Sequence, residues 1–258
     1  MKKLTFLLWI SFCAFLLLPV NSVMGQGSTN QQAYAVHEDV VLPSMVGEYE
    51  KISKEFMDVV NKYNIQGMGW IASQTNDYRY LFIRPIANMG DLDNNAFWTN
   101  MREKMGAEKF SDMFNRMNKC YDLHCDYVLN LDKDLSYMPG GITQTPAGKD
   151  YRRFYYLHTT PQLAGKLAES IKAVKDMFVK KGSKMDYRIY RSGFGTRGQF
   201  FMVAIAAKDG ADYEAMDAAN NALLGPEAEK TFGEMMKYIT KFEEVTGRMR
   251  PDLAYSPK

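Results

Sequence analysis

The chain of 258 residues lacks the short motifs that mark the best-known enzyme classes. It has no phosphate-binding loop, no nucleophile elbow, no zincin helix and no dinucleotide-binding fingerprint. Its acidic residues are scattered along predicted helix faces as solvated charges and form no obvious carboxylate pair. Histidine is scarce as well, with three in the chain. Any function therefore has to be inferred from the predicted architecture.

The charge balance excludes two classes of partner. Lysine and arginine together number 32 against 30 acidic residues, a formal net charge of +2. Lys2 and Lys3 are the only charged residues among the first 25, so the rest of the chain is neutral. A neutral chain has no general attraction for nucleic acid or for an anionic membrane surface. We expect neither as a partner.

The N-terminus predicts export. Lys2 and Lys3 precede an apolar run, Leu4 to Val20, and the small-residue segment 21–25 follows. This is the pattern of a secretory signal peptide, here residues 1–25, followed by a disordered leader, residues 26–32. An uncleaved anchor is the alternative, but the run falls short of the roughly 20 residues of a spanning helix. We expect a periplasmic or secreted protein of a Gram-negative-type bacterium, with no stable membrane span after cleavage.

Cysteine is scarce beyond the signal peptide. Only Cys120 and Cys125 remain, with His124 between them. An oxidising compartment allows a local disulfide between the two, and two unpaired thiols are the alternative. A structural zinc site takes four ligands, and no second cluster is present. We therefore predict no metal.

One phrase occurs twice and organises the chain. Asp134–Pro139 (DLSYMP) returns as Asp252–Pro257 (DLAYSP), 118 positions later. The repetition predicts two homologous units, residues 33–139 and 151–258. Between them, residues 140–150 have the composition of a linker.

Each unit shows the same order of predicted elements. A strand that ends in histidine comes first, and a helix with one apolar stripe follows it. A strand hairpin is next, then a helix broken by glycine and a last strand. The first strands are Ala33–His37 and Phe154–His158, and the helices that follow them are Met45–Tyr63 and Pro161–Lys180. The hairpins are Gly67–Ile83 and Met185–Ala206. The second helices are broken at Gly106 and Gly225, and the last strands are Asp126–Leu131 and Glu243–Met249.

This order is that of a ferredoxin-like unit, an antiparallel sheet with both helices on one face. The fold class we predict is α+β, with two tandem ferredoxin-like βαββαβ units. Their antiparallel sheets pack into an intramolecular α+β barrel, because a second sheet covers the open face of the first. The fused pair is expected to be a monomer, with a dimer of fused pairs as the alternative.

The element order, the aromatic strands and the glycine-broken second helix resemble the dimeric α+β barrel superfamily. It includes antibiotic-biosynthesis-type monooxygenases, NIPSNAP-like and EthD-like proteins, and the chlorite dismutase and dye-decolourising peroxidase group. The resemblance is one of topology and covers nearly all of the mature chain. Its haem-binding members imply a histidine ligand on a helix of the second unit. The segments Pro161–Lys180 and Tyr213–Phe242 contain no histidine, which argues against haem.

Several residues are candidates for a site. His37 and His158 each end the first strand of their unit and could act as a base, although local hydrogen bonding is an equally simple role. Arg84, Arg188 and Tyr190 combine arginine with aromatic rings and could hold a planar or anionic ligand, or be edge charges. Trp70 and Tyr156 could line a soft apolar interior, or be core.

The function we expect is that of an exported, non-enzymatic barrel protein. It would bind a small apolar or aromatic ligand, or serve an interaction role, without a cofactor. The first alternative is a cofactor-independent, monooxygenase-like enzyme with a histidine base. The second is haem or metal binding. An open cavity with convergent polar groups would favour a ligand or substrate, whereas a filled space between the sheets would favour a structural role.

Overall fold

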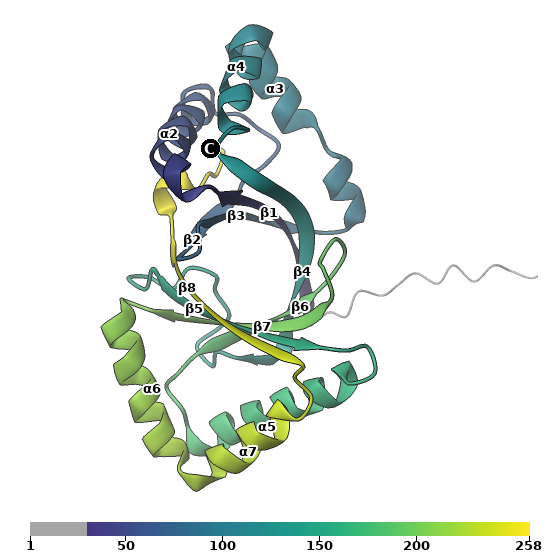
Figure 1. Ribbon diagram of the computed structural model, residues 1–258, viewed down its shortest axis with the longest axis vertical. Helices are drawn as coiled ribbons and strands as arrows, with labels where there is room; N and C mark the ends of the chain where they lie inside the picture. Colours follow the sequence, from purple (N-terminus) through teal and green to yellow (C-terminus); the bar gives the residue numbers. More distant parts are fainter. Residues whose placement is uncertain (1–29) are drawn as a thin grey trace, which may run out of the picture.

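The computed structural model describes residues 30–258, which form a β-barrel between two layers of helices (Figure 1). The predicted signal peptide lies outside the described residues. Gln31 and Gln32, which we assigned to the leader, instead begin the first strand and pair with Asp132 and Leu131. Within residues 30–258, none of the helices combines the length and the apolar character that a membrane span needs.

Both units have the predicted order of elements. The first contains β1 (Gln31–Val41), the short 3₁₀ helix η2 (Pro43–Met45), α2 (Val46–Tyr63), β2 (Ile71–Thr75), β3 (Arg79–Ile86), η3 (Met89–Asp93), α3 (Ala96–Met105), α4 (Ala107–Met117) and β4 (Tyr121–Tyr137). The second contains β5 (Tyr151–Thr159), α5 (Ala164–Lys181), β6 (Tyr187–Ser192), β7 (Gln199–Ala207), α6 (Gly210–Leu224), α7 (Pro226–Met236), β8 (Lys241–Met249) and η4 (Pro251–Leu253).

The strands close into one barrel in the order β1-β3-β2-β8-β5-β7-β6-β4. Each unit contributes a four-stranded sheet in which the first and third strands are central. The units join edge to edge, β2 with β8 and β4 with β6, and all pairs are antiparallel. Closure leaves neither sheet with an unpaired edge. The predicted α+β fold is therefore confirmed, with the two sheets joined at their edges as well as packed across the interior.

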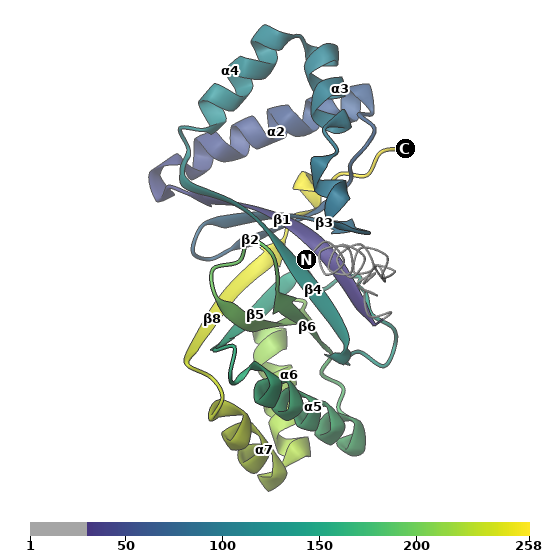
Figure 2. The same cartoon turned by 90° about the vertical axis from the view of Figure 1, so that its right-hand side faces the viewer.

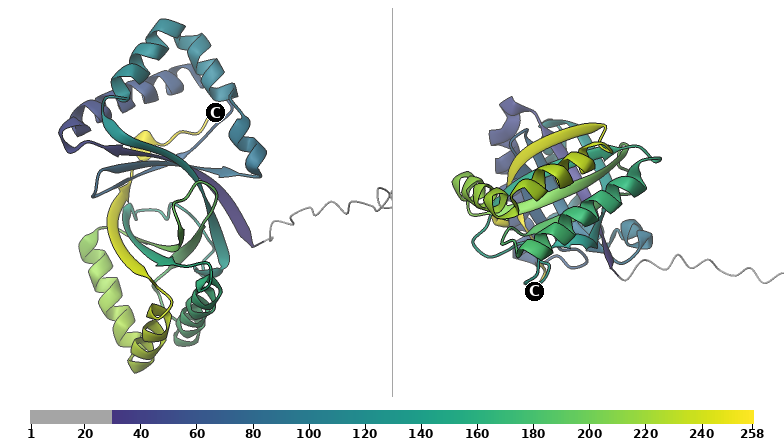
Figure 3. Two further views of the ribbon diagram at one scale, coloured as in Figure 1. Left: turned by 45° about the vertical axis from the view of Figure 1, so that its right-hand side comes forward. Right: turned by 90° about the horizontal axis from the view of Figure 1, so that it is seen from below.

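Glycine breaks the second helix of each unit where the sequence predicted. Gly106 separates α3 from α4 with φ of +88°, and Gly225 separates α6 from α7 with φ of +63°. Residues with a Cβ rarely adopt such positive φ, and Pro226 then suits the first position of α7. In the view from below, α5, α6 and α7 lie across the outer face of the barrel (Figure 3).

The apolar residues gather into three clusters. One fills the barrel, with Val36, Leu129, Phe154 and Met202 among its members. The other two lie between the barrel wall and the helices of each unit, which Figure 2 shows at opposite ends of the molecule. Because strand residues alternate between the two faces of a sheet, each strand supplies one side of a helix-covered core and one side of the barrel interior.

The two closing phrases are exchanged between the units. Leu135 and Tyr137, still within β4, belong to the helix–sheet core of the second unit, where the Tyr137 hydroxyl donates to Ser183 O at 2.8 Å. Tyr255 belongs to the corresponding core of the first unit and donates to Ile65 O at 2.9 Å. Each unit therefore completes the core of the other.

The predicted linker, residues 140–150, packs against the barrel. Ile142 contacts the cluster in the barrel interior. The Gln144 side-chain amide donates to the Tyr34 hydroxyl at 3.1 Å, which fastens the segment to β1. The connection between β4 and β5 thus covers part of the barrel.

Candidate functional site

A cavity of about 430 Å³ lies between the barrel wall of the first unit and helices α2, α3 and α4. Its size is within the range of small-molecule sites. It differs from the barrel interior, where the free space is only about 60 Å³. The free space that favours a ligand-binding role over a structural one thus lies outside the barrel. Seven Phe, Trp and Tyr side chains line the larger cavity: Phe56, Trp70, Phe82, Trp98, Phe114, Tyr127 and Phe194.

Phe194 reaches this cavity from the second unit. It lies in the loop between β6 and β7, and its carbonyl accepts from the Val128 N–H of β4 at 2.7 Å. Gly195 makes this approach possible, because a Cβ there would lie 2.6 Å from Asp126 O, and its φ is +80°. From the sequence we expected this segment to be an ordinary hairpin loop. The run Gly193-Phe194-Gly195, an aromatic residue between two glycines, could have indicated that the loop packs closely against another strand.

Two histidines and two aspartates form a quartet at the edge of the cavity: His37, Asp39, His124 and Asp126. The register of β1 and β4 places His37 opposite Asp126 and Asp39 opposite His124. His37 Nδ1 donates to Asp126 Oδ1 at 3.0 Å, and His124 Nδ1 donates to Asp39 Oδ1 at 2.9 Å. His37 Nε2 lies 3.5 Å from Asp39 Oδ1. His37 and Asp126 also line the cavity.

The electrostatics of the quartet centre on His37. Burial lowers the pKa of its imidazole, but the hydrogen bonds and charges of Asp126 and Asp39 outweigh burial and raise that pKa to about 9. The bond to His37 in turn lowers the pKa of Asp126. Asp39 is buried and accepts a second hydrogen bond from the Tyr49 hydroxyl at 2.7 Å. The quartet is therefore an anchored network with a strongly basic imidazole.

The quartet also contains the donor types that a metal ion uses. Ligand atoms of His37, His124 and Asp126 all lie within 4.8 Å of one another. The sequence analysis considered His124 only together with its neighbours Cys120 and Cys125. The pairing across strands was not visible without the register of β1 and β4.

Two other predicted ligand-binding residues lie at this cavity. Trp70 contributes its ring face, because its indole N–H donates to Leu253 O at 2.8 Å. Arg84 lines the cavity from β3 and donates from Nη2 to Asp91 O at 3.2 Å. Ser53 was missed. Its hydroxyl is buried in the wall, and among residues 30–258 it has no hydrogen-bond partner. The cavity thus offers the Arg84 guanidinium and the unpaired Ser53 hydroxyl in addition to His37.

The remaining ligand-binding candidates lie inside the barrel. Tyr156, Arg188 and Tyr190 line its nearly filled interior. Arg188 Nη1 donates to Thr143 O and Gln144 O, both at 2.8 Å, and the Tyr190 hydroxyl is hydrogen-bonded to the Gln144 side chain. Arg188 and Tyr190 thus hold the covering segment to the barrel, and none of the three residues lines the aromatic cavity.

The two strand-end histidines are not equivalent. The spacing of 118 positions relates the His37–Asp126 strand pair to the Tyr155–Glu244 pair. His158 is bonded to Glu243 at 2.5 Å and lies on the opposite strand face from Tyr155. Matching the two strands by their terminal histidines, as we did from the sequence, relates positions that are 121 apart. This is three positions away from the spacing of 118. Only His37 lines the cavity.

The cysteines are both free thiols, so the candidate disulfide is not formed. Cys120 directly precedes β4, and Cys125 lies within that strand. Five residues of extended strand span about 16 Å, whereas a disulfide needs its two Cα atoms within about 7 Å. The Cys120 Sγ instead lies 3.6 Å from Arg116 O. Burial raises the pKa of both thiols.

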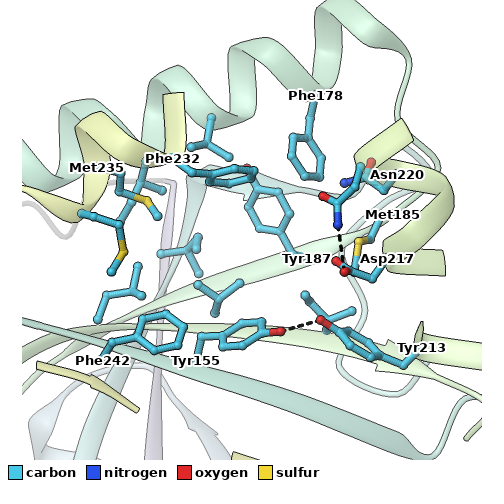
Figure 4. A pocket seen from close by; sticks show the side chains of 18 residues that line it. Tyr155, Phe178, Met185, Tyr187, Tyr213, Asp217, Asn220, Phe232, Met235 and Phe242 are labelled. Atoms are coloured by element: carbon cyan, nitrogen blue, oxygen red, sulfur yellow. Dashed lines mark hydrogen bonds between the residues drawn. The ribbon is translucent and has the colours of Figure 1, made fainter. Parts of the chain in front are cut away.

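A second cavity, of about 300 Å³, occupies the corresponding place in the second unit (Figure 4). Its lining is mostly apolar. The hydroxyls of Tyr155 and Tyr213 are hydrogen-bonded to each other at 2.5 Å. Among the residues that the structure describes, no histidine lines this cavity.

Tyr187, which lines this second cavity, and its neighbour Tyr137 should differ in their effect on stability. Its hydroxyl is buried and, among residues 30–258, has no partner, whereas the neighbouring Tyr137 hydroxyl is bonded to Ser183 O. A buried unpaired hydroxyl is costly, so Tyr187→Phe is expected to raise the free energy of unfolding by about 1 kcal/mol. Tyr137→Phe should lower it by about 1 kcal/mol. Urea denaturation measures both. Equal losses in the two variants would mean that Tyr187 has a partner in solution.

Comparison with known proteins places the fold. No family model and no curated protein matches the chain. An anthrone oxidase-like protein superposes with a TM-score of 0.55 at 13% identity, over 85% of this chain and 91% of that one. A heme-binding protein from Thermus thermophilus gives 0.46 at 14% identity, over 87% and 93%. A chlorite dismutase variant from Candidatus Nitrospira defluvii gives 0.47 at 10% identity, over 86% and 92%.

One of these neighbours contradicts our expectation of a non-enzymatic protein. The structure with the highest TM-score among them is described as an anthrone oxidase-like protein, and this chain shares its fold over most of both lengths. The open cavity beside a histidine–aspartate pair agrees better with the enzyme alternative than with a structural role. The chain therefore has the fold of the dimeric α+β barrel proteins, with both ferredoxin-like units joined in one polypeptide.

Proposed function

We propose that the protein is an oxygenase-type enzyme that oxidises a planar aromatic substrate in the cavity of the first unit. The observation that carries this proposal is the His37–Asp126 pair at the edge of an aromatic cavity of about 430 Å³. A base oriented by a second side chain is the usual arrangement for proton abstraction. Asp126 holds Nδ1, which leaves Nε2 as the nitrogen that can accept a proton once the imidazole is neutral, at a pH above its pKa of about 9.

The lining suits a flat, largely apolar molecule with one polar group. Phe82 and Trp98 are among the rings that can pack on its faces. Arg84 can hold an oxygen that becomes negatively charged during the reaction. The unpaired Ser53 hydroxyl offers one further hydrogen bond. These groups favour an aromatic ketone or phenol over an aliphatic substrate.

The chemistry we propose is that of an anthrone-type substrate. Its methylene carbon loses a proton to His37, and the resulting carbanion, stabilised by the rings, reduces O₂. One oxygen atom becomes the new carbonyl of a quinone, and the other leaves as water with both methylene hydrogens. Anthrone plus O₂ thus gives anthraquinone plus H₂O. Because the substrate anion supplies the electrons, this reaction needs no separate cofactor.

Two likenesses support the proposal. The anthrone oxidase-like neighbour has the same fold, and the element order resembles the antibiotic-biosynthesis-type monooxygenases. At 13% identity the first likeness concerns the fold, so the residues of this chain must supply the rest of the argument. His37, Asp126 and Arg84 do so, since all three line one cavity.

Oxygen consumption with anthrone as substrate tests the proposal. The wild-type protein should consume one O₂ per anthraquinone formed, followed with an oxygen electrode and by absorbance. Arg84→Gln should lower kcat/KM by about 10-fold or more, since a hydrogen bond to a charged group contributes roughly 1.5–3 kcal/mol. Arg102→Gln, at an exposed position of α3, is the matched control. Turnover no faster than with heat-denatured protein would refute the proposal.

A further inference from the structure

The pattern His-x-Asp occurs on two neighbouring strands of the first unit. His37 and Asp39 lie on β1, and His124 and Asp126 lie on β4. The strands are antiparallel, so each histidine faces the aspartate of the other strand. Residues two apart share a strand face, which brings all four side chains together. The two imidazole rings are 4.4 Å apart between centroids.

Asp39 orients the His124 imidazole, because its carboxylate accepts from His124 Nδ1. Asp126 instead lies 3.0 Å from His37 Nδ1, where a metal ion can replace the shared proton. A carboxylate on one ring nitrogen is the arrangement that most metal-bound histidines have, because it fixes the tautomer and the direction of the other nitrogen. Asp39 is held firmly in this role, since its side chain is 3% exposed and its other oxygen accepts from Tyr49.

The outer residues of the quartet remain open to solvent. The side chain of His124 is 47% exposed and that of Asp126 is 74% exposed, so an ion can enter without disturbing the fold. The second unit has no such set. At the equivalent strand positions it carries an aromatic, an aliphatic, another aromatic and an acidic residue, namely Tyr155, Leu157, Phe242 and Glu244. The quartet is a feature of the first unit only.

We propose that His37, His124 and Asp126 bind a divalent first-row transition-metal ion, with Asp39 as the residue that positions His124. The donor atoms of the three ligands already lie within 4.8 Å of one another. Two imidazole nitrogens and one carboxylate oxygen suit Zn²⁺ or Co²⁺, and water can complete the coordination. Mg²⁺ and Ca²⁺ prefer all-oxygen sites and should bind far more weakly.

Metal binding can be measured without any substrate. Metal-stripped protein is titrated with Co²⁺, and the visible d–d absorption of the bound ion is followed, with calorimetry for Zn²⁺. We expect one ion per chain. His124→Ala should abolish the absorption, and Asp39→Asn should weaken binding by roughly 10–100-fold. His158→Ala removes the remaining histidine, which is bonded to Glu243, and is the matched control that should bind as wild type.

Two results would overturn the metal site: no saturable absorption at millimolar Co²⁺, or an unchanged titration in His124→Ala. Circular dichroism checks that each variant is folded, and Asp39→Asn repeats the test if His124→Ala is not. One consequence rests on the proposed function: an imidazole that binds a metal ion is a much weaker base. Zn²⁺ should then inhibit oxygen uptake by the wild type, and a chelator should restore it. Because cobalt binding is read without turnover, an inactive protein would refute the proposed function and leave the metal result standing.

Discussion

The His37→Gln variant is expected to oxidise its aromatic substrate about 10²–10⁴-fold more slowly than the wild type, which is the usual contribution of a positioned general base. Glutamine can still donate its amide hydrogens to Asp126, so the network at the cavity edge is kept. It cannot accept a proton, whereas His37 can do so above its pKa of about 9, so the two enzymes are compared at alkaline pH. The loss should therefore appear in kcat at saturating substrate, measured by oxygen uptake, with KM changed little.

His158→Gln is the control for this experiment. His158 is also a strand-end histidine beside a carboxylate, but its Nε2 is bonded to Glu243 and it does not line the aromatic cavity. Its replacement should leave kcat within a factor of two or so, as expected for a group outside the reaction. A His37→Gln enzyme that keeps a third or more of the wild-type rate would remove His37 from the mechanism.

The Arg250→Met variant is expected to lose about 2–3 kcal/mol of its unfolding free energy. The Arg250 side chain is 7% exposed and follows β8. Its guanidinium donates to both oxygens of Glu50 on α2, at 2.5 and 2.7 Å, and to both oxygens of Asp252, at 2.9 and 2.7 Å. Removing one partner from a buried ion pair costs roughly 3–5 kcal/mol, and the partial exposure of the two carboxylates reduces this.

The neighbouring arginine provides the control. Arg248 is exposed and donates only to the Gln74 side chain, so Arg248→Met should change the unfolding free energy by less than about 0.5 kcal/mol. Urea denaturation monitored by fluorescence measures both. Equal effects in the two variants would show that the Arg250 network adds nothing to stability.

Acid pH gives a second measurement on the same network. Hydrogen bonds from Arg250 lower the pKa of Glu50 and of Asp252 below their usual values. Groups with a lowered folded-state pKa stabilise the fold above their unfolded pKa of about 4, and this stabilisation is lost as the pH falls through the folded value. The wild type should therefore lose stability between neutral pH and pH 3 more steeply than Arg250→Met does.

The architecture could be predicted because it rests on local patterns and on one repeat. Helical periodicity in α5, glycine at Gly106 and Gly225, and the repeated closing phrase each depend on residues close together in the chain. The extent of β4 was underestimated. It runs from Tyr121 to Tyr137, whereas the predicted strand covered only Asp126–Leu131 and left out the charged and polar residues on either side. They can lie in a strand because their backbone pairs with β1 and β6 on either side.

The candidate site was only partly predictable, because its residues meet through register. His37 and Arg84 were singled out from the sequence, and both line the cavity. The pairing of His37 with Asp126, 89 positions away, follows from how β1 aligns with β4, which no local pattern specifies. A one-residue slip would have moved the His37 side chain to the sheet face that lines the barrel. His158 lies on that face in the second unit, next to Tyr156.

The exchange of closing phrases has a consequence for how the chain folds. The core of the first unit is incomplete until Leu253 and Tyr255, which follow the last strand of the second unit, pack into it. The core of the second unit is likewise incomplete until Leu135 and Tyr137 pack into it. Contacts between such distant positions form slowly, because a large loop must close before they stabilise anything. Neither half can then reach its native state ahead of the other. The two units should melt in a single cooperative transition, so that the duplication produced one folding domain rather than two.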